Sequence, residues 1–299
     1  MLRFLNSYSS LAIVFCTCLV IQNGQAQRIE NEFKLAVPDG QAEAIWLFLQ
    51  EELAGASLLY FDSAFTSTFA EETFFDIYFD DSKETVAQFE AGVRLRERFV
   101  EDTLSKRLLQ IKLPTSDTSG VARQEIKFTP YTKIKRSDRQ ATHPFWSNVK
   151  PKDRDEVNLL LASMQLSGDD LSPALKLYQN RRRAYVSKEG VPFLTATLDR
   201  VSYYYFPYPE FTELELELNE IMYTDADFDQ RSAMEAINKQ IRDRLFEQFP
   251  GLVQDQTPKY NKMRNLISGN FLIWLGENLH YIILGMLVLT ASILFLRNR

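Results

Sequence analysis

Charged and apolar residues alternate along much of this chain. In the segment 213–218 glutamates alternate strictly with leucines, and arginines occupy every second position of the segment 94–98. Successive side chains of a strand point to opposite faces, so these segments predict strands with one charged and one apolar face. We expect strands at 73–80, 91–100, 107–113, 122–129, 174–187, 192–206 and 211–219. Strands at this spacing are typical of an antiparallel sheet or barrel.

Three segments instead have apolar residues at helical spacing. The segment 41–54 has Ile45, Leu49 and Leu53 on one face, and helices are also expected at 153–165 and 229–249. The middle helix lies in a region, 130–172, that interrupts the rhythm of the strands. That region is either an inserted lid or end-plug, or a helix that packs on the barrel.

The first 26 residues have the features of a secretory signal peptide. Arg3 precedes an apolar run from 11 to 21, and the sequence Gly24-Gln25-Ala26 follows before Gln27. The run has about 11 residues, which is too short to cross a bilayer, although an uncleaved anchor remains an alternative. Both cysteines, Cys16 and Cys18, lie in this segment. A mature chain would therefore have neither a disulfide nor a thiolate metal site.

A second membrane signal lies at the C-terminus. The segment 280–296 is apolar apart from His280, and it is followed by Arg297 and Arg299. This predicts a membrane anchor rather than a buried core helix, with the arginines on the cytoplasmic side and a juxtamembrane linker at 263–279. With the signal peptide, the anchor predicts an extracytoplasmic domain, on the periplasmic or cell-surface side, tethered by its C-terminus.

Net charge limits the class of partner. The formal net charge of −6 argues against general nucleic-acid binding. A local basic lining can still hold a polyanion, because nearby charges act at short range.

The segment 30–34 concentrates candidate chemistry. In a strand, Glu30, Glu32 and Lys34 would project to one side. Two carboxylates beside an ammonium suit a divalent cation and the phosphate oxygens that it carries, although a solvated edge strand has the same pattern. If the charged faces of all the strands pointed into one barrel, they would form a tunnel lined by about eight cationic and seven acidic side chains.

The order of these motifs resembles the triphosphate tunnel metalloenzymes, the CYTH superfamily. Glu-x-Glu-x-Lys at 30–34 is followed by Arg-x-Arg at 94–96, Lys112, Arg-x-Glu at 123–125, a basic cluster before Tyr185, Leu-Asp at 198–199 and Glu-x-Glu at 213–215. Polyphosphate-polymerase domains of the VTC type share much of this order, but their first strand usually lacks the paired glutamates. The resemblance implies an α+β domain at 27–262, with an eight-stranded antiparallel tunnel and flanking helices. It also implies a requirement for Mg²⁺ or Mn²⁺ and substrates with a linear triphosphate or polyphosphate.

The resemblance also assigns candidate roles. The phosphate-binding candidates are Lys34, Arg94, Arg96, Lys112, Arg123, Arg182 and Lys259. The metal candidates are Glu30, Glu32, Glu213 and Glu215, and the catalytic candidates are Glu125 and Asp199. Asn180 stands where the family usually has a lysine, so one phosphate contact is either missing or supplied by Arg181 or Arg183. Lys259 is either the family's closing lysine or a linker residue ahead of the anchor.

The leading functional hypothesis is a metal-dependent phosphohydrolase acting on inorganic triphosphate, polyphosphate or an organic triphosphate. The alternatives are a VTC-like polyphosphate polymerase, a non-catalytic polyphosphate or anion binder, and a structural scaffold. The two histidines, His143 and His280, are too far apart in sequence to suggest a histidine-rich metal site, and no glycine-rich phosphate loop is evident.

Overall fold

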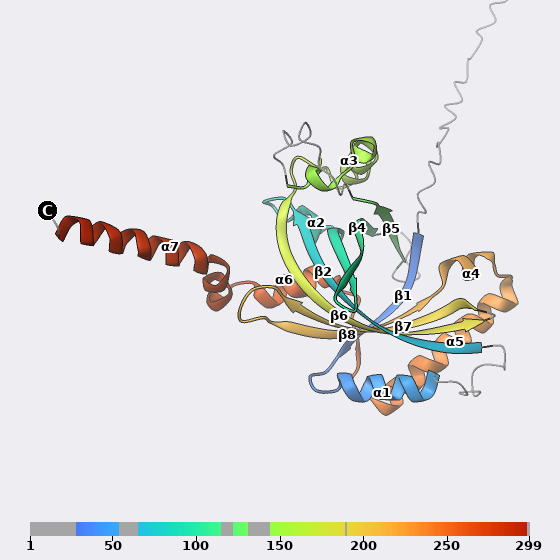
Figure 1. The fold of residues 1–299 in the computed structure, drawn as a ribbon. Coiled ribbons are helices and arrows are strands. Elements are labelled where there is room, and N and C mark those ends of the chain that lie inside the picture. Colours follow the sequence, from blue (N-terminus) through green and yellow to red (C-terminus); the bar gives the residue numbers. More distant parts are fainter. Residues whose placement is uncertain (1–27, 54–64, 115–121, 131–143, 189, 298–299) are drawn as a thin grey trace, which may run out of the picture.

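A closed antiparallel barrel forms the centre of the molecule (Figure 1). The computed structural model describes residues 28–53, 65–114, 122–130, 144–188 and 190–297, so the predicted signal segment lies outside the described residues. The strands are β1 (Arg28–Val37), β2 (Phe65–Asp80), β3 (Gly92–Val100), β4 (Thr103–Pro114), β5 (Ala122–Phe128), β6 (Ser172–Lys188), β7 (Val191–Tyr203), β8 (Glu210–Leu218) and β9 (Val253–Gln254).

Eight of these strands form the ring. Their order is β5-β4-β3-β2-β6-β7-β8-β1, and β1 pairs back to β5, which closes the barrel. One strand can do this because the first part of β1, residues 28–31, pairs with β5, whereas residues 32–37 pair with β8. The expectation of an eight-stranded antiparallel tunnel is confirmed. The two-residue strand β9 pairs with Leu35 and Ala36 of β1, and it is too short to have a pattern of its own.

Helices cover the apolar outer face of the barrel in separate clusters. On one side α1 (Ala42–Leu53), α4 (Glu220–Asp225) and α5 (Phe228–Gln248) pack against β1, β6, β7 and β8. This buries the leucines that alternate with the glutamates of β8, including Leu214 and Leu216. The short helix α2 (Thr85–Gln88) precedes β3, and α6 (Lys259–Ile267) packs against β2, β6 and β7.

The interrupting region contributes a packing helix. Within the described residues 144–171, α3 (Arg154–Ala162) buries Val157 and Leu161. These side chains belong to the same apolar cluster as Leu109 and Ile111 of β4. The described residues 144–171 therefore pack on the outside of the barrel wall. This agrees with the expected packing helix and not with a lid or end-plug.

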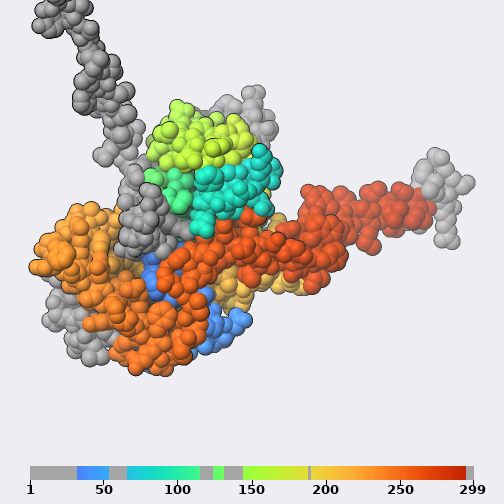
Figure 2. All heavy atoms as spheres, turned by 180° about the vertical axis from the view of Figure 1, so that it is seen from behind, coloured from blue at the N-terminus to red at the C-terminus, as the bar shows by residue number. Residues whose placement is uncertain are grey.

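The C-terminal helix α7 (Phe271–Arg297) extends away from the barrel. Its residues 271–293 are long and apolar enough to cross a membrane, as judged by length and composition. The helix begins before the anchor expected at 280–296. The segment 263–279, expected as a linker, is mostly helical, because α6 ends at Ile267 and α7 starts at Phe271. Figure 2 shows α6 crossing the barrel before the chain continues into α7.

Candidate active site

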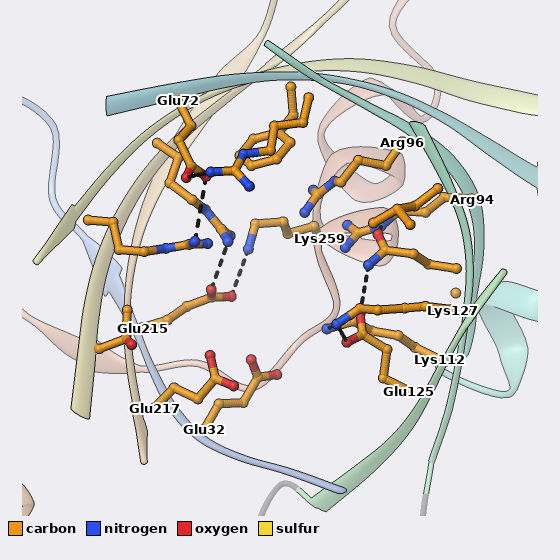
Figure 3. Close-up of a pocket in the computed structure, with 18 of the residues that line it drawn as sticks. Glu32, Glu72, Arg94, Arg96, Lys112, Glu125, Lys127, Glu215, Glu217 and Lys259 are labelled. Carbon is orange, nitrogen blue, oxygen red and sulfur yellow. Dashed lines mark hydrogen bonds and ion pairs between the residues drawn. The ribbon is translucent and has the colours of Figure 1, made fainter. Parts of the chain in front are cut away.

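The barrel encloses a cavity of about 420 Å³ that all eight strands of the ring and α6 line. Among the described residues, ten cationic side chains line it: Lys34, Arg94, Arg96, Arg98, Lys106, Lys112, Lys127, Arg181, Arg183 and Lys259. Five acidic side chains accompany them: Glu32, Glu72, Glu125, Glu215 and Glu217. Figure 3 shows Glu32 and Glu217 pointing into the cavity from one side and Arg94 and Arg96 from another. The lining is thus more cationic than the sequence suggested.

Alternation along β1 and β8 places one set of acids in the cavity, which we call the acid wall: Glu32, Glu215 and Glu217. The strand register sets Glu32 opposite Glu217, and Lys34 opposite Glu215. The Nζ atom of Lys34 lies 2.8 Å from Oε1 of Glu32 and 3.4 Å from Oε1 of Glu215. Glu30 lies opposite Arg123 of β5 in the same register. The side chains of Glu30 and Arg123 lie outside the described set, so their roles stay predictions.

The facing carboxylates of the acid wall favour a bound cation. Burial raises the pKa of Glu217, and the charge of Glu32 raises it further. Burial also disfavours ionisation of Glu32, but Lys34 and Lys112 outweigh this effect and lower its pKa. Carboxylate oxygens are the ligands that Mg²⁺ and Mn²⁺ prefer. Glu32 and Glu217 therefore offer oxygens of the kind that a divalent cation prefers, whereas Glu215 of the same wall is bound by Lys34 and Lys259.

A second acidic cluster lies deeper, where Asp199, Glu213 and Glu215 bring their carboxylate oxygens within 4.8 Å of one another. Lys259 lies among them. Its Nζ atom is 3.0 Å from Oδ2 of Asp199 and 2.7 Å from Oε1 of Glu215, and it also contacts Glu213. Burial alone would lower the pKa of Lys259, but the three carboxylates raise it well above its ordinary value. The ammonium therefore takes the position that a metal ion would need.

Two predicted site residues, Asp199 and Glu213, do not line the cavity. Asp199 and Glu213 are fully buried and lie behind the cavity lining. Asp199 accepts hydrogen bonds from Nε and Nη2 of Arg181, at 2.7 and 2.5 Å, and Glu213 also accepts a bond of 2.9 Å from Lys262. Burial opposes ionisation of Asp199, yet Arg181 and Lys259 lower its pKa. Both acids are thus already neutralised by cations of the chain.

Lys259 is part of a helix that closes onto the barrel and is no linker residue. The neighbouring Tyr260 stacks on Tyr78 with ring centroids 5.1 Å apart, and its hydroxyl donates a 2.8 Å hydrogen bond to Asp80. These contacts bury the first turn of α6. The expected Lys-Tyr pair therefore reaches the cavity.

The opposite side of the cavity is an arginine wall, formed by Arg94, Arg96 and Arg98 of β3 with Arg181 and Arg183 of β6. Arg96 forms two hydrogen bonds with Asp76, of 2.7 and 2.6 Å, and Arg94 donates to the same carboxylate at 3.4 Å. Burial opposes ionisation of Asp76, but the two arginines lower its pKa. The guanidinium groups of Arg94 and Arg96 are therefore held in position by a buried carboxylate of β2.

The sequence analysis missed Asp76 and its neighbour on the same face, Glu72. Both sit in a run rich in aromatic residues that reads as a buried strand. Glu72 contacts Arg98 and lies 3.5 Å from Arg183. A usable signal was the regular spacing of acids at 72, 76 and 80, which places all three on one face of β2.

Lys112 and Glu125 lie together on β4 and β5, as expected from their cross-strand register. The Nζ atom of Lys112 is 3.7 Å from Glu125, which also contacts Lys127 and accepts a 2.9 Å hydrogen bond from Gln110. Gln110 in turn accepts from Arg94 at 2.9 Å. Glu125 is thus connected to the arginine wall, in a position to orient it.

The placement of Arg182 in the tunnel is wrong. Its side chain lies on the outer face, 2.6 Å from Glu43 of α1 and 3.4 Å from Glu71. The register pairs Arg181 with the inward-facing Glu72, so Arg181 and Arg183 point inward instead. A shift of one residue moves a side chain to the other face of a strand.

Arg98, the last of the three alternating arginines at 94–98, also lines the cavity. Arg107 instead pairs with Glu97 outside the cavity lining. The strand alternation of β3 therefore extends as far as Arg98.

No protein-family model and no curated protein matches the sequence. Solved structures with a similar chain path include a candidate adenylate cyclase from Bacillus halodurans, with 17% identity and a TM-score of 0.45 over 81% of this chain and 99% of that one. A candidate adenylyl cyclase from Hippeastrum, described as having a dominant triphosphatase activity, has 16% identity and a TM-score of 0.43 over 79% and 95%. The RNA triphosphatase Pct1 of S. pombe has 9% identity and a TM-score of 0.34 over 71% and 73%.

These neighbours are described as candidate adenylate cyclases and a triphosphatase. At such identities and TM-scores the similarity by itself supports no statement about activity. The functional assignment therefore rests on the residues of the tunnel.

Proposed function

We propose that the chain is a metal-dependent phosphohydrolase that acts on inorganic triphosphate, polyphosphate or an organic triphosphate. The observation that supports this is the lining of the cavity, in which ten cationic side chains accompany five acidic ones. A linear triphosphate carries several negative charges in a row, and a cavity with this excess of cations matches it along its length.

The chain's own residues would bind and orient the phosphates. Phosphoryl transfer depends mostly on positioning and on neutralising charge. Arg94 and Arg96 present guanidinium forks suited to two phosphate oxygens each, and their bonds to Asp76 hold them in place. Lys34 and Lys112 add point charges beside the acid wall.

The divalent cation would be held by Glu32 and Glu217, with Glu215 adjacent. Lys34 contacts Glu32, whereas burial and the charge of Glu32 raise the pKa of Glu217, so a cation at Glu217 would relieve this repulsion. When bound, Mg²⁺ or Mn²⁺ supplies charge neutralisation of phosphate oxygens and lowers the pKa of a bound water. Glu125, which holds Lys112 and Lys127 near the cavity, would position cations around the substrate.

The setting we propose is a membrane. Helix α7 would act as a single C-terminal anchor, with the barrel on the periplasmic or cell-surface side and the terminal arginines in the cytoplasm. A reporter active only in the cytoplasm, fused after Phe249 in a chain truncated there, should give no signal; a strong signal would overturn this topology.

Release of phosphate from triphosphate by the full-length, detergent-purified protein tests the function. We expect turnover with Mg²⁺ or Mn²⁺ and none in excess chelator. Combined Glu32→Gln and Glu217→Gln substitutions should abolish turnover while circular dichroism shows an intact barrel. The matched control is Glu97→Gln, which changes an acid of β3 outside the cavity lining. Full activity in the double variant would remove the metal assignment.

One observation favours a second candidate, a non-catalytic polyphosphate or anion binder. Lys259 contacts all three acids of the deeper cluster and so leaves fewer open ligands for metals. Calorimetric binding of triphosphate without phosphate release under any metal condition would identify this function.

A further inference from the structure

The tip of the β7–β8 hairpin and the first turn of α7 expose four aromatic side chains, which we call the aromatic tip. On the hairpin Phe206 and Tyr208 are each 58% exposed, and on α7 Phe271 and Trp274 are 67% and 53% exposed. Within each pair the rings contact one another, with centroids 6.0 and 5.9 Å apart. The proposed hydrolysis uses none of them. Large exposed aromatic groups that gather in this way mark a contact surface.

The hairpin is fixed against the helix. The hydroxyl of Tyr203 donates a hydrogen bond to the carboxylate of Glu277, and Ile273 is buried in the same apolar cluster as Tyr203. The backbone of Gly276 approaches Phe206 so closely that a Cβ atom there would lie 2.3 Å from the Phe206 carbonyl oxygen. Figure 1 shows the hairpin beside the start of α7. The tip of the hairpin therefore lies beside the first turns of α7, at about the level of Trp274 along the helix axis.

The length of α7 places that depth at the surface of a bilayer. Its 27 residues extend about 40 Å, whereas the hydrocarbon core is about 30 Å thick. One or two turns must lie outside the hydrocarbon. The polar Glu277 and His280 identify these turns as the ones next to the barrel. Tryptophan and tyrosine are favoured at this interface.

Chemistry suited to lipid headgroups continues along the barrel from the tip. Tyr178 and Tyr204 are 44% and 37% exposed and contact each other. Lys176 donates to the hydroxyl of Tyr205 at 3.4 Å and lies 5.7 Å from the centre of the Tyr204 ring. A lysine among aromatic rings combines an apolar surface with a charge for lipid phosphate.

We propose that the aromatic tip docks the barrel on the surface of the bilayer in which α7 is anchored, with its rings at the level of the headgroups. The inference rests on the membrane anchor of the proposed function. The barrel would then keep one orientation relative to the membrane instead of swinging on the short connection between α6 and α7.

Site-directed fluorescence on the full-length protein in phosphatidylcholine–phosphatidylglycerol vesicles tests the docking. Cys16 and Cys18 are replaced by serine, and single cysteines that carry an environment-sensitive dye are introduced by Tyr208→Cys, Leu159→Cys or Leu287→Cys. Leu159 is the matched control, because it is 75% exposed on α3. We expect lipids with a nitroxide near the headgroup to quench the dye at 208 several-fold more than the dye at 159, with blue-shifted emission at 208. Position 287 reports the anchor through lipids with a deep nitroxide.

The outcomes separate the possibilities. Water-like emission at 208 with efficient quenching at 287 overturns the docking and leaves the anchor in place. No quenching at 287 overturns the anchor and the docking together. Blue-shifted emission at 208 that disappears on dilution and is insensitive to nitroxide lipids assigns the surface to a second copy of the chain, which also overturns the docking. Phosphate release measured on the same samples confirms folding and tests the hydrolase separately.

Discussion

The two walls of the tunnel bury charge in different ways. On the arginine wall the guanidinium groups have carboxylates of the chain as partners, as Arg96 has Asp76 and Arg181 has Asp199. On the acid wall Glu32 faces Glu217, and burial together with the neighbouring charge raises the pKa of Glu217. A buried charge is tolerated when it is paired, whereas two facing carboxylates favour a proton or a metal ion. The arginine wall therefore has its partners within the chain, whereas the pair Glu32 and Glu217 would be stabilised by the metal ion of the proposed function.

The largest expected effect comes from breaking the arginine wall at Arg96. The Arg96→Ala substitution leaves the buried Asp76 with its weaker partner Arg94 alone, and we expect the free energy of unfolding to fall by about 3–5 kcal/mol. Urea titration measures it. The control, Arg107→Ala, removes an arginine of the neighbouring strand β4 whose ion pair with Glu97 is partly exposed on both sides, and it should lower the free energy of unfolding by about 1 kcal/mol at most. An equal decrease in the free energy of unfolding for Arg96→Ala and the control would show that the ion pair with Asp76 does not stabilise the arginine wall.

Freeing the deeper acidic cluster should create a metal site. In Lys259→Met the carboxylates of Asp199, Glu213 and Glu215 lose their shared ammonium. In a background with Glu32→Gln and Glu217→Gln, which removes the proposed metal ligands of the acid wall, we expect thermal unfolding of Lys259→Met to become dependent on Mn²⁺, with stabilisation of about 2.7 kcal/mol when free Mn²⁺ is 100 times its dissociation constant. Lys262→Met in the same background is the control, because Lys262 touches Glu213 without entering the cluster. An equal Mn²⁺ response of the background with Lys259 intact would mean that the lysine does not compete with metal.

Two adjacent arginines of β6 sharpen the assignment of the arginine wall. Arg183→Ala should weaken triphosphate binding about tenfold or more, since a charge-assisted bond contributes about 1.5–3 kcal/mol. Arg182→Ala removes an exposed ion pair and should change binding by less than about 1 kcal/mol. Calorimetric titration with triphosphate compares the two variants. Similar losses would contradict the inward and outward placement.

The smallest expected effect is a dependence of stability on pH from Glu217. Its raised pKa means that the folded protein holds the proton more tightly than the unfolded chain does. Its contribution is fully present below the unfolded pKa and is lost as the pH rises toward the folded pKa. Above about pH 4.3, Glu217→Gln should therefore gain stability relative to wild type without metal. Unfolding by urea between pH 4 and 7 tests this, with the exposed Glu210→Gln as the control; parallel pH profiles for all three proteins would contradict it.

Much of the acid wall followed from local pattern. Strict alternation with leucine fixed the faces of Glu213, Glu215 and Glu217, because side chains alternate within a single strand whatever the strand pairs with. The same reasoning placed Arg94 and Arg96 on one face of β3. Helices α1, α3 and α5 were predicted from the spacing of their apolar residues. This spacing is also a local property, because each helix packs one apolar face on the barrel.

Only the tertiary structure decided which arginine of β6 enters the tunnel. The run Arg181-Arg182-Arg183 has no apolar alternation to orient it, so the pairing of β6 with β2 sets its face. The same holds for Lys259 and Asp76. The partners of Lys259 lie on β7 and β8, and those of Asp76 on β3, far from each in sequence. The sequence by itself determined the charged faces of the strands, because alternation is local. Closure of the barrel determined which opposite charges meet, because those pairs come together only when distant strands do.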